Sequence, residues 1–228
     1  MSDIPIRLAV LDMAGTTVAD GGLVLKAFET AATAGGIEEV GPERDRARQY
    51  VIDTMGQSKI AVFRHLLGDE DRAQHANRTF EDAYDRLIGD GHARPIDGAV
   101  EAISTLRNVG VKVALTTGFS ASTKEKLLAA LGWADIADLT LAPSEAGRGR
   151  PYPDLVLTSV LRLEVNDVRE VAVLGDTSSD VLAGHRAGAQ IVAGTLTGAH
   201  DAAQLSTAQP THIVHSVGEF ADIVLHRI

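Results

Sequence analysis

The chain lacks cysteine altogether over its 228 residues. A disulfide framework and a metal site built from thiolates are therefore excluded. Long apolar runs are missing as well, and none approaches the ~20 residues that a helix needs to span a bilayer. Residues 1–7 do not have the pattern of a signal peptide. From these absences we expect a cytoplasmic protein with no membrane partner.

Positive charge is also scarce. Lys and Arg number 21 against 31 Asp and Glu, which gives a formal net charge of -10. Binding to a nucleic-acid backbone requires a basic surface, so we expect no nucleic-acid partner. A small phosphonate or phosphate substrate is compatible with this composition, because a few local cations can oppose the net charge.

The hydrophobic residues, 45% of the chain, are arranged as in an α/β protein. Aliphatic runs predict strands at about 8–11, 111–115, 139–141, 171–174, 190–193 and 212–214, with helical patterns between most of them. From about residue 23 to 89 the apolar spacing is helical throughout, as for Ile60, Phe63 and Leu67. We therefore predict a core of residues 1–19 and 94–228 with an inserted helical cap, residues 20–93.

The first aliphatic run leads directly into Asp12 and then into a turn that contains Gly15, Thr16 and Thr17. In open α/β sheets, ligands bind at the carboxyl ends of the strands. The amides and hydroxyls of this turn suit an anion such as phosphate. Taken alone, Asp12 could equally close a strand and cap the next turn.

Three later segments also place polar side chains at strand ends or in a proline-stiffened loop. These residues are Thr117 with Gly118, Arg150 before Pro151, and Asp176 with Asp180. Each has an ordinary structural interpretation, as a turn residue, a surface ion pair or a helix-dipole partner. Their appearance together, in this order, indicates one catalytic site.

In these motifs the chain resembles the haloacid dehalogenase superfamily over essentially its whole length. The resemblance implies an α/β fold with a doubly wound, mostly parallel, Rossmann-like sheet and an inserted helical cap. It also implies that Asp12 attacks phosphorus and that Mg²⁺ is the cofactor. The implied metal ligands are Asp12, the carbonyl of Ala14, Asp176 and Asp180, the last as a ligand or as the holder of a metal-bound water. Thr117 and Arg150 would bind the phosphoryl oxygens.

The chain looks most like the phosphonoacetaldehyde hydrolase (phosphonatase) branch of that superfamily. Asp-x-Ala-Gly-Thr-Thr-Val from Asp12 is this branch's signature, and Ala14 stands where most phosphatases carry a second Asp. The run from Met55 to Lys59 matches the branch's Met-Gly-x-x-Lys segment, which places Lys59 at the Schiff-base lysine. Two positions depart from the branch, because Val62 replaces a His and Gly22 replaces a Cys.

These residues suggest a chemical role for Lys59. A carbon leaving group that is activated as an iminium departs as an enamine and needs no carboxylic acid at position 14. The resemblance adds Ala14, Met55, Gly118 and Arg150 as substrate contacts. Three alternatives stay open: a phosphatase of small esters with Lys59 as a binding residue, a non-catalytic binding module, and an ordinary solvated role for Lys59. Pairing of two subunits into a homodimer through the cap is also open.

Overall fold

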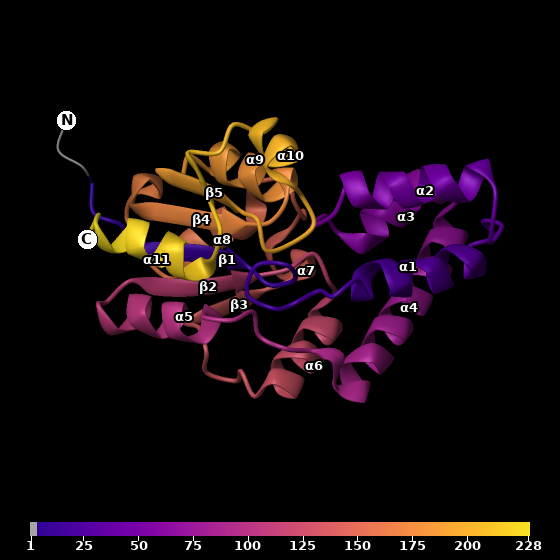
Figure 1. Cartoon of the computed structure of the whole chain (residues 1–228), viewed down its shortest axis with the longest axis horizontal. Helices are drawn as coiled ribbons and strands as arrows, with labels where there is room; N and C mark the ends of the chain where they lie inside the picture. Colours follow the sequence, from indigo (N-terminus) through magenta and orange to yellow (C-terminus); the bar gives the residue numbers. More distant parts are fainter. Residues whose placement is uncertain (1–3) are drawn as a thin grey trace.

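The computed structural model describes residues 4–228 and confirms the α/β prediction (Figure 1). One sheet of six strands has the order β3-β2-β1-β4-β5-β6, and every neighbouring pair is parallel. The strands are β1 (Leu8–Asp12), β2 (Lys112–Thr116), β3 (Leu139–Leu141), β4 (Val171–Gly175), β5 (Ile191–Thr195) and β6 (His212–Val214). The two central strands, β1 and β4, are buried along their whole length, as their unbroken aliphatic sequences require.

Helices cover both faces of the sheet. In β1, Ala9 and Leu11 belong to the apolar cluster of one face, and Leu8 and Val10 to that of the other. This alternation follows from the two-residue repeat of a strand. The first face packs against α5 (Ala99–Asn108) and α11 (Val217–Leu225), and the second against α8 (Asp154–Arg162) and α9 (Ser178–Ala187). The remaining core helices are α6 (Ala121–Leu131), α7 (Pro143–Ala146) and α10 (Ala202–Ser206), with the 3-10 turn η2 (Val168–Glu170).

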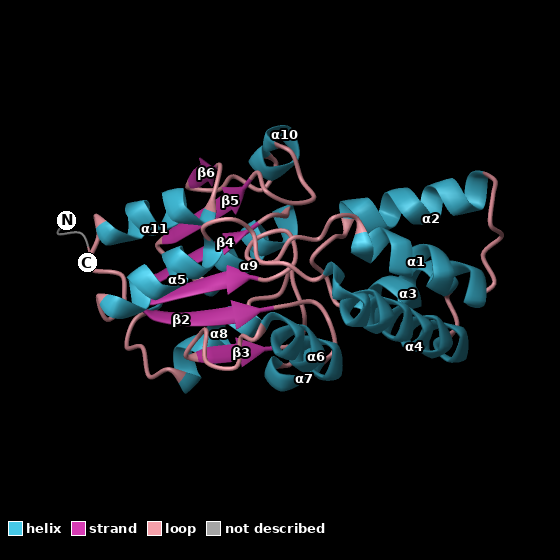
Figure 2. Ribbon diagram, turned by 60° about the horizontal axis from the view of Figure 1, so that its bottom comes forward, coloured by secondary structure: helices cyan, strands magenta, loops and turns pink. Residues whose placement is uncertain are grey.

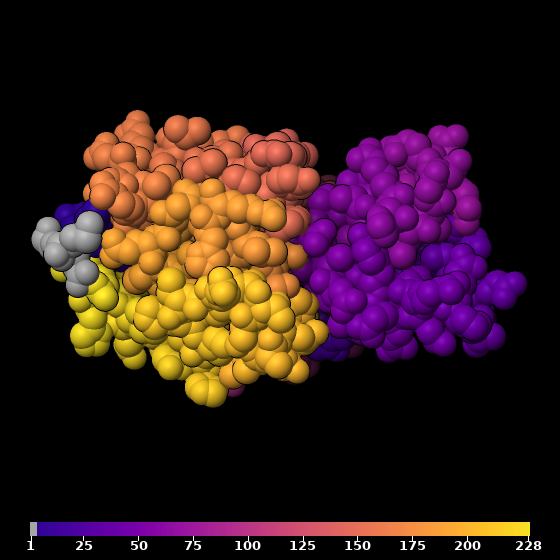
Figure 3. Space-filling view, turned by 90° about the horizontal axis from the view of Figure 1, so that it is seen from above, coloured from indigo at the N-terminus to yellow at the C-terminus, as the bar shows by residue number. Residues whose placement is uncertain are grey.

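The chain between β1 and α5 forms a separate helical lobe at one end of the molecule (Figures 1 and 3). It contains α1 (Leu23–Ala34), α2 (Pro42–Asp53), α3 (Lys59–Leu67), α4 (Glu70–Leu87) and the π-helical turn η1 (Ile88–His92). Its centre is a row of buried rings in which Phe28 and Phe80 flank Phe63. Within residues 4–228, no helix is both long and apolar enough to cross a bilayer. The domain limits at residues 19–20 and 93–94 stay a prediction.

The two segments that connect the helical lobe to the sheet are paired with each other. Ala19 donates a backbone hydrogen bond to Arg94, and Ile96 donates one to Thr17. Val18 and Pro95 form an antiparallel bridge. Figure 2 shows the strands pointing toward the lobe. The carboxyl ends of the strands, where a ligand site is expected, therefore face the helices.

Candidate active site

A cavity of about 320 Å³ lies between the carboxyl ends of the strands and the helical lobe. The predicted site residues that line it are Asp12, Ala14, Thr117, Gly118 and Asp176 from the core, and Met55 and Lys59 from the lobe. Arg150 is buried beside Asp12, at 2.8 Å from Arg150 Nη1 to Asp12 Oδ1. Segments far apart in the sequence thus meet at one place.

Asp12 is the last residue of β1 and is buried. The turn that follows it is closed by Thr17, whose hydroxyl donates to the Asp12 carbonyl at 2.9 Å. Burial raises the pKa of the Asp12 carboxyl well above its ordinary value, Arg150 opposes this rise, and the charges of Asp180 and Asp176 add to it. The carboxylate is therefore poorly solvated, as a reactive nucleophile requires.

Arg150 contacts two carboxylates, a hydroxyl at the end of β2 and a backbone carbonyl of the helical lobe. Its Nε lies 2.6 Å from Asp180 Oδ1, and its Nη2 donates to Thr116 Oγ1 at 2.5 Å. Its Nη1 also donates to the carbonyl of Gly56 in the helical lobe, at 3.3 Å. The guanidinium is thus fixed beside Asp12 and contacts the lobe. Nothing in its sequence pattern indicates the contact with Thr116, which precedes the predicted Thr117.

Asp176 follows β4 and faces the turn after β1. Its Oδ2 accepts the amide of Ala199 at 2.7 Å, and its Oδ1 accepts the Thr16 hydroxyl at 3.5 Å. Burial, with the added repulsion of Asp180, raises the pKa of the Asp176 carboxyl. Gly15 has φ +90°, and a Cβ there would lie 2.3 Å from Asp176 Oδ2. Only glycine therefore allows the turn to approach this carboxylate so closely.

Asp180, which the sequence predicts as a metal ligand or as the holder of a metal-bound water, lies beside Arg150 at the start of α9. One of its oxygens pairs with Arg150, and the other accepts the backbone amide of Thr177 at 3.2 Å in the capping box that starts α9. Both oxygens of Asp180 therefore already have a protein partner. In this arrangement Asp180 positions Arg150 beside Asp12.

The acidic groups of the site can hold a hard divalent cation. Three buried carboxylates, those of Asp12, Asp176 and Asp180, are opposed in charge by a single buried guanidinium, and Arg150 pairs with only two of them. Among the described residues, no group of three or more His, Asp or Glu side chains forms a cage for a metal ion. Two cavity-lining carboxylates and a backbone carbonyl suit Mg²⁺, because this ion usually keeps several waters and takes few protein ligands.

Lys59 is the first residue of α3 and lines the cavity from the side of the lobe. Its Nζ lies 5.6 Å from the ring centre of Phe119 and 5.9 Å from that of Phe80. No hydrogen bond or ion pair to its ammonium is found within residues 4–228. Burial lowers the pKa of Lys59 to about 8, although Asp20 and Asp12 oppose this shift. The amine is therefore unusually available for attack on a carbonyl carbon.

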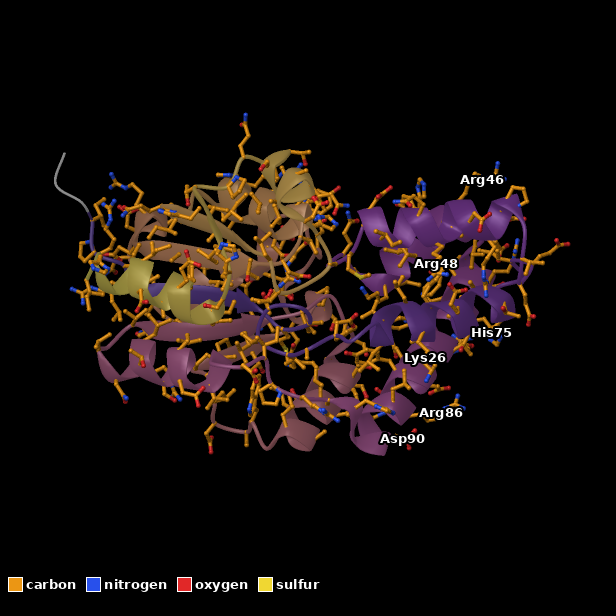
Figure 4. All side chains as sticks on the ribbon, in the orientation of Figure 1. Lys26, Arg46, Arg48, His75, Arg86 and Asp90 are labelled. Atoms are coloured by element: carbon orange, nitrogen blue, oxygen red, sulfur yellow. The ribbon has the colours of Figure 1, made fainter. Side chains whose placement is uncertain are left out.

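No other polar side chain of α3 is placed in the cavity to exchange a proton with Lys59. Val62, one turn further along α3, is buried and apolar. His65 lies on the same helix but is exposed, and its ring stacks on Tyr50 at 4.3 Å, outside the cavity. Figure 4 shows His75 and Arg86 on the outer surface of the lobe, away from the sheet. His65, His75 and Arg86 are therefore exposed to solvent and lie outside the cavity.

The sequence is similar to a family of hydrolases and to individual proteins named for hydrolysis. A profile of haloacid dehalogenase-like hydrolases matches residues 6–188. A phosphonoacetaldehyde hydrolase of Pseudomonas aeruginosa strain UCBPP-PA14 is 31% identical over 207 residues, which cover 85% of this chain and 74% of that protein. A protein of Dickeya dadantii named "Probable phosphatase IndB" is 26% identical over 217 residues, with 93% and 90% covered.

A solved structure shows the same fold. A phosphonoacetaldehyde hydrolase-like protein from Oleispira antarctica superposes with a TM-score of 0.83 at 23% identity, covering 97% of this chain and 92% of that one. At 23% identity this similarity shows that the two proteins share a fold, and its coverage of 97% of this chain includes the helical lobe.

Proposed function

Because the chain belongs to the haloacid dehalogenase-like hydrolases, we propose that it is a Mg²⁺-dependent hydrolase that cleaves the carbon–phosphorus bond of phosphonoacetaldehyde or a close relative. The observation that carries this proposal is an amine of lowered pKa, Lys59, in the same cavity as the buried carboxylate of Asp12. The relative from Pseudomonas aeruginosa, which is named for this reaction, supports it.

In the proposed reaction, Lys59 forms a Schiff base with the aldehyde carbon. The positively charged iminium withdraws electrons from the carbon–phosphorus bond, so the carbon fragment leaves as an enamine when phosphorus is attacked. Ala14 is compatible with this route, since its methyl group cannot protonate an ester oxygen. Met55 and Gly118, which line the cavity, would contact the carbon fragment.

Asp12 is the proposed nucleophile and forms an aspartyl phosphate that water later hydrolyses. Arg150, 2.8 Å from Asp12, would bind a phosphoryl oxygen by charge-assisted hydrogen bonds, and the Thr117 hydroxyl would bind another. Mg²⁺ would be held by Asp12, the Ala14 carbonyl and Asp176. When bound, this ion screens the repulsion between the carboxylate and the phosphoryl group.

Replacement of Asp176 tests the proposed metal site. We expect Asp176→Ala to raise the Mg²⁺ concentration for half-maximal activity by at least about tenfold, with activity recovered at high Mg²⁺, because one ionic ligand is lost. A Mg²⁺ titration of phosphate release measures this effect. Asp222→Ala, at an exposed position on α11, is the control. An unchanged titration would remove Asp176 from the metal site.

The pH dependence of Lys59 tests its environment. Its pKa is lowered to about 8 by burial, so the free amine predominates above that pH, whereas an ordinary lysine needs a pH above ~10.4. We expect cyanoborohydride trapping of an aldehyde on Lys59 to rise from pH 6 through a midpoint near pH 8 and to level off about one pH unit above that midpoint. Mass spectrometry of the modified peptide at each pH gives the rate. A midpoint near pH 10 would contradict a buried, activated amine.

A phosphatase of small phosphate esters is the second candidate, favoured by the relative from Dickeya dadantii. It would use the same nucleophile, with Lys59 as a binding cation. Measurement of phosphate release with Mg²⁺ from phosphonoacetaldehyde and from a panel of phosphate esters separates the two. Release from the phosphonate supports the proposed function, and release from esters alone supports the phosphatase.

A further inference from the structure

Asp20 is a cavity-lining carboxylate with no role in the chemistry described so far. The titratable residues among those that line the cavity are Asp12, Asp20, Lys59 and Asp176. Asp12 and Asp176 are occupied by phosphoryl transfer and the metal site in the proposed function. Asp20 is then the one acid–base group of this lining that is free to serve Lys59.

The backbone fixes the carboxylate of Asp20 at the entrance to the helical lobe. Its Oδ2 accepts the amide of Gly22 and its Oδ1 accepts the amide of Val24, each at 3.1 Å. These bonds hold the side chain at the start of α1. Gly22 lines the same cavity, and a Cβ at its position would meet no atom within 4 Å. The group is therefore oriented without being covered.

Asp20 and Lys59 line the same cavity, and the charge of Asp20 acts on Lys59. Of the charges that favour the ammonium form of Lys59, Asp20 has the largest effect on its pKa, ahead of Asp12 and Asp176. Within the described residues, the two groups nevertheless form no ion pair. This leaves the amine free for a substrate while a carboxylate stands near. The apolar Val62, buried among the helices, offers no alternative proton carrier.

We propose that Asp20 is the general acid–base residue for the reaction of Lys59 with the carbonyl substrate. This role rests on the proposed function. The carboxylate of Asp20 first takes a proton from the Lys59 ammonium. The free amine then attacks the carbonyl carbon, and Asp20 relays a proton from the nitrogen to the new oxygen. Asp20 finally donates its remaining proton to the hydroxyl, which leaves as water while the nitrogen lone pair forms the iminium bond.

This sequence of steps balances. Lys59 ammonium and carbonyl become iminium and one water, and Asp20 ends as the carboxylate with which it began. The new positive charge of the iminium then lies near a carboxylate that is already oriented by two amides. Asp20 thus favours the charged intermediate as well as its formation.

The competing explanation for Asp20 is that it only caps α1. Asp20→Asn and Asp20→Ser separate the two roles, because Asn and Ser are good helix caps but cannot carry a proton at neutral pH. Asp69→Asn is a matched control: Asp69 caps α4 in the same lobe, accepts the Arg72 amide at 2.8 Å and does not line the cavity. The measured quantity is the rate at which borohydride traps phosphonoacetaldehyde on Lys59, with thermal melting to follow folding.

We expect both Asp20 variants to form the adduct about 100-fold more slowly than wild type, with added formate restoring part of the rate in Asp20→Ser. Asp69→Asn should trap at the wild-type rate. Unchanged trapping in the Asp20 variants would overturn the proposed role of Asp20 but not the proposed function. The same conclusion follows if trapping slows only together with a lowered melting temperature and formate does not restore it. A wild-type protein that forms no adduct overturns the proposed function, and this role with it.

Discussion

Asp12→Asn should abolish turnover, lowering it by about four orders of magnitude or more. An amide is a poor nucleophile and cannot form the acyl phosphate. The change also removes one of the negative charges around Arg150, so the proposed metal site loses a ligand together with its nucleophile. Phosphate release with each substrate measures the loss. Beryllofluoride with Mg²⁺, a mimic of the aspartyl phosphate, should raise the melting temperature of wild type only.

The fold of this variant should stay intact. Burial raises the pKa of Asp12, which means that the charged carboxylate costs free energy in the folded protein relative to the unfolded chain. Neutralising that charge should therefore leave the melting temperature unchanged or higher. Asp135→Asn, at an exposed position between α6 and β3, controls for the substitution itself. Retained turnover in Asp12→Asn would contradict the proposed covalent mechanism.

Lys59→Arg should lose the borohydride adduct completely and lower phosphonoacetaldehyde turnover by about three orders of magnitude or more. A guanidinium keeps the positive charge but remains protonated, so it is no nucleophile at neutral pH. Mass spectrometry after trapping with phosphonoacetaldehyde locates the adduct, and phosphate release measures turnover. Formation of the adduct on Lys59 in wild type is the direct sign of a Schiff base.

Lys26→Arg is a suitable control for this change. Lys26 is exposed on α1, on the outer surface of the helical lobe (Figure 4). Its replacement should affect neither adduct nor turnover. If Lys59→Arg retains much of its activity and wild type forms no adduct, then Lys59 acts through its charge, and the hydrolysis of phosphate esters becomes the better assignment.

The strands could be predicted from the sequence because strands of a covered parallel sheet are aliphatic on both faces. The expected runs at 171–174 and 212–214 match β4 and β6 to within one residue. The placement of polar residues at strand ends followed from the same logic, since neighbouring parallel strands end at one edge. The order of the strands in the sheet could not be predicted from the residues, because the sequence of a strand does not determine which strands pair with it.

The surroundings of the catalytic groups were less predictable, because they depend on long-range packing. Phe80 reaches Lys59 from another helix of the lobe, and no local spacing indicates that contact. The contacts of Asp180 with Arg150 and Thr177 were likewise not indicated by its spacing from Asp176, and its role as a metal ligand or holder of a metal-bound water stays a prediction. Asp20 was not among the predicted site residues. Its position before two glycines and a helix is a capping signal, and that signal does not reveal the cavity beyond it.

The paired connecting segments also bear on how such a protein can diversify. Because Ala19 is hydrogen-bonded to Arg94, the chain leaves the sheet and returns to it at the same point. The intervening helices can therefore be lengthened, shortened or exchanged as a cassette without altering the path of any strand. Lys59 and Met55 come from that cassette and Asp12 does not, so under the proposed function a graft at this point would exchange the contacts to the carbon fragment and leave the proposed nucleophile in place.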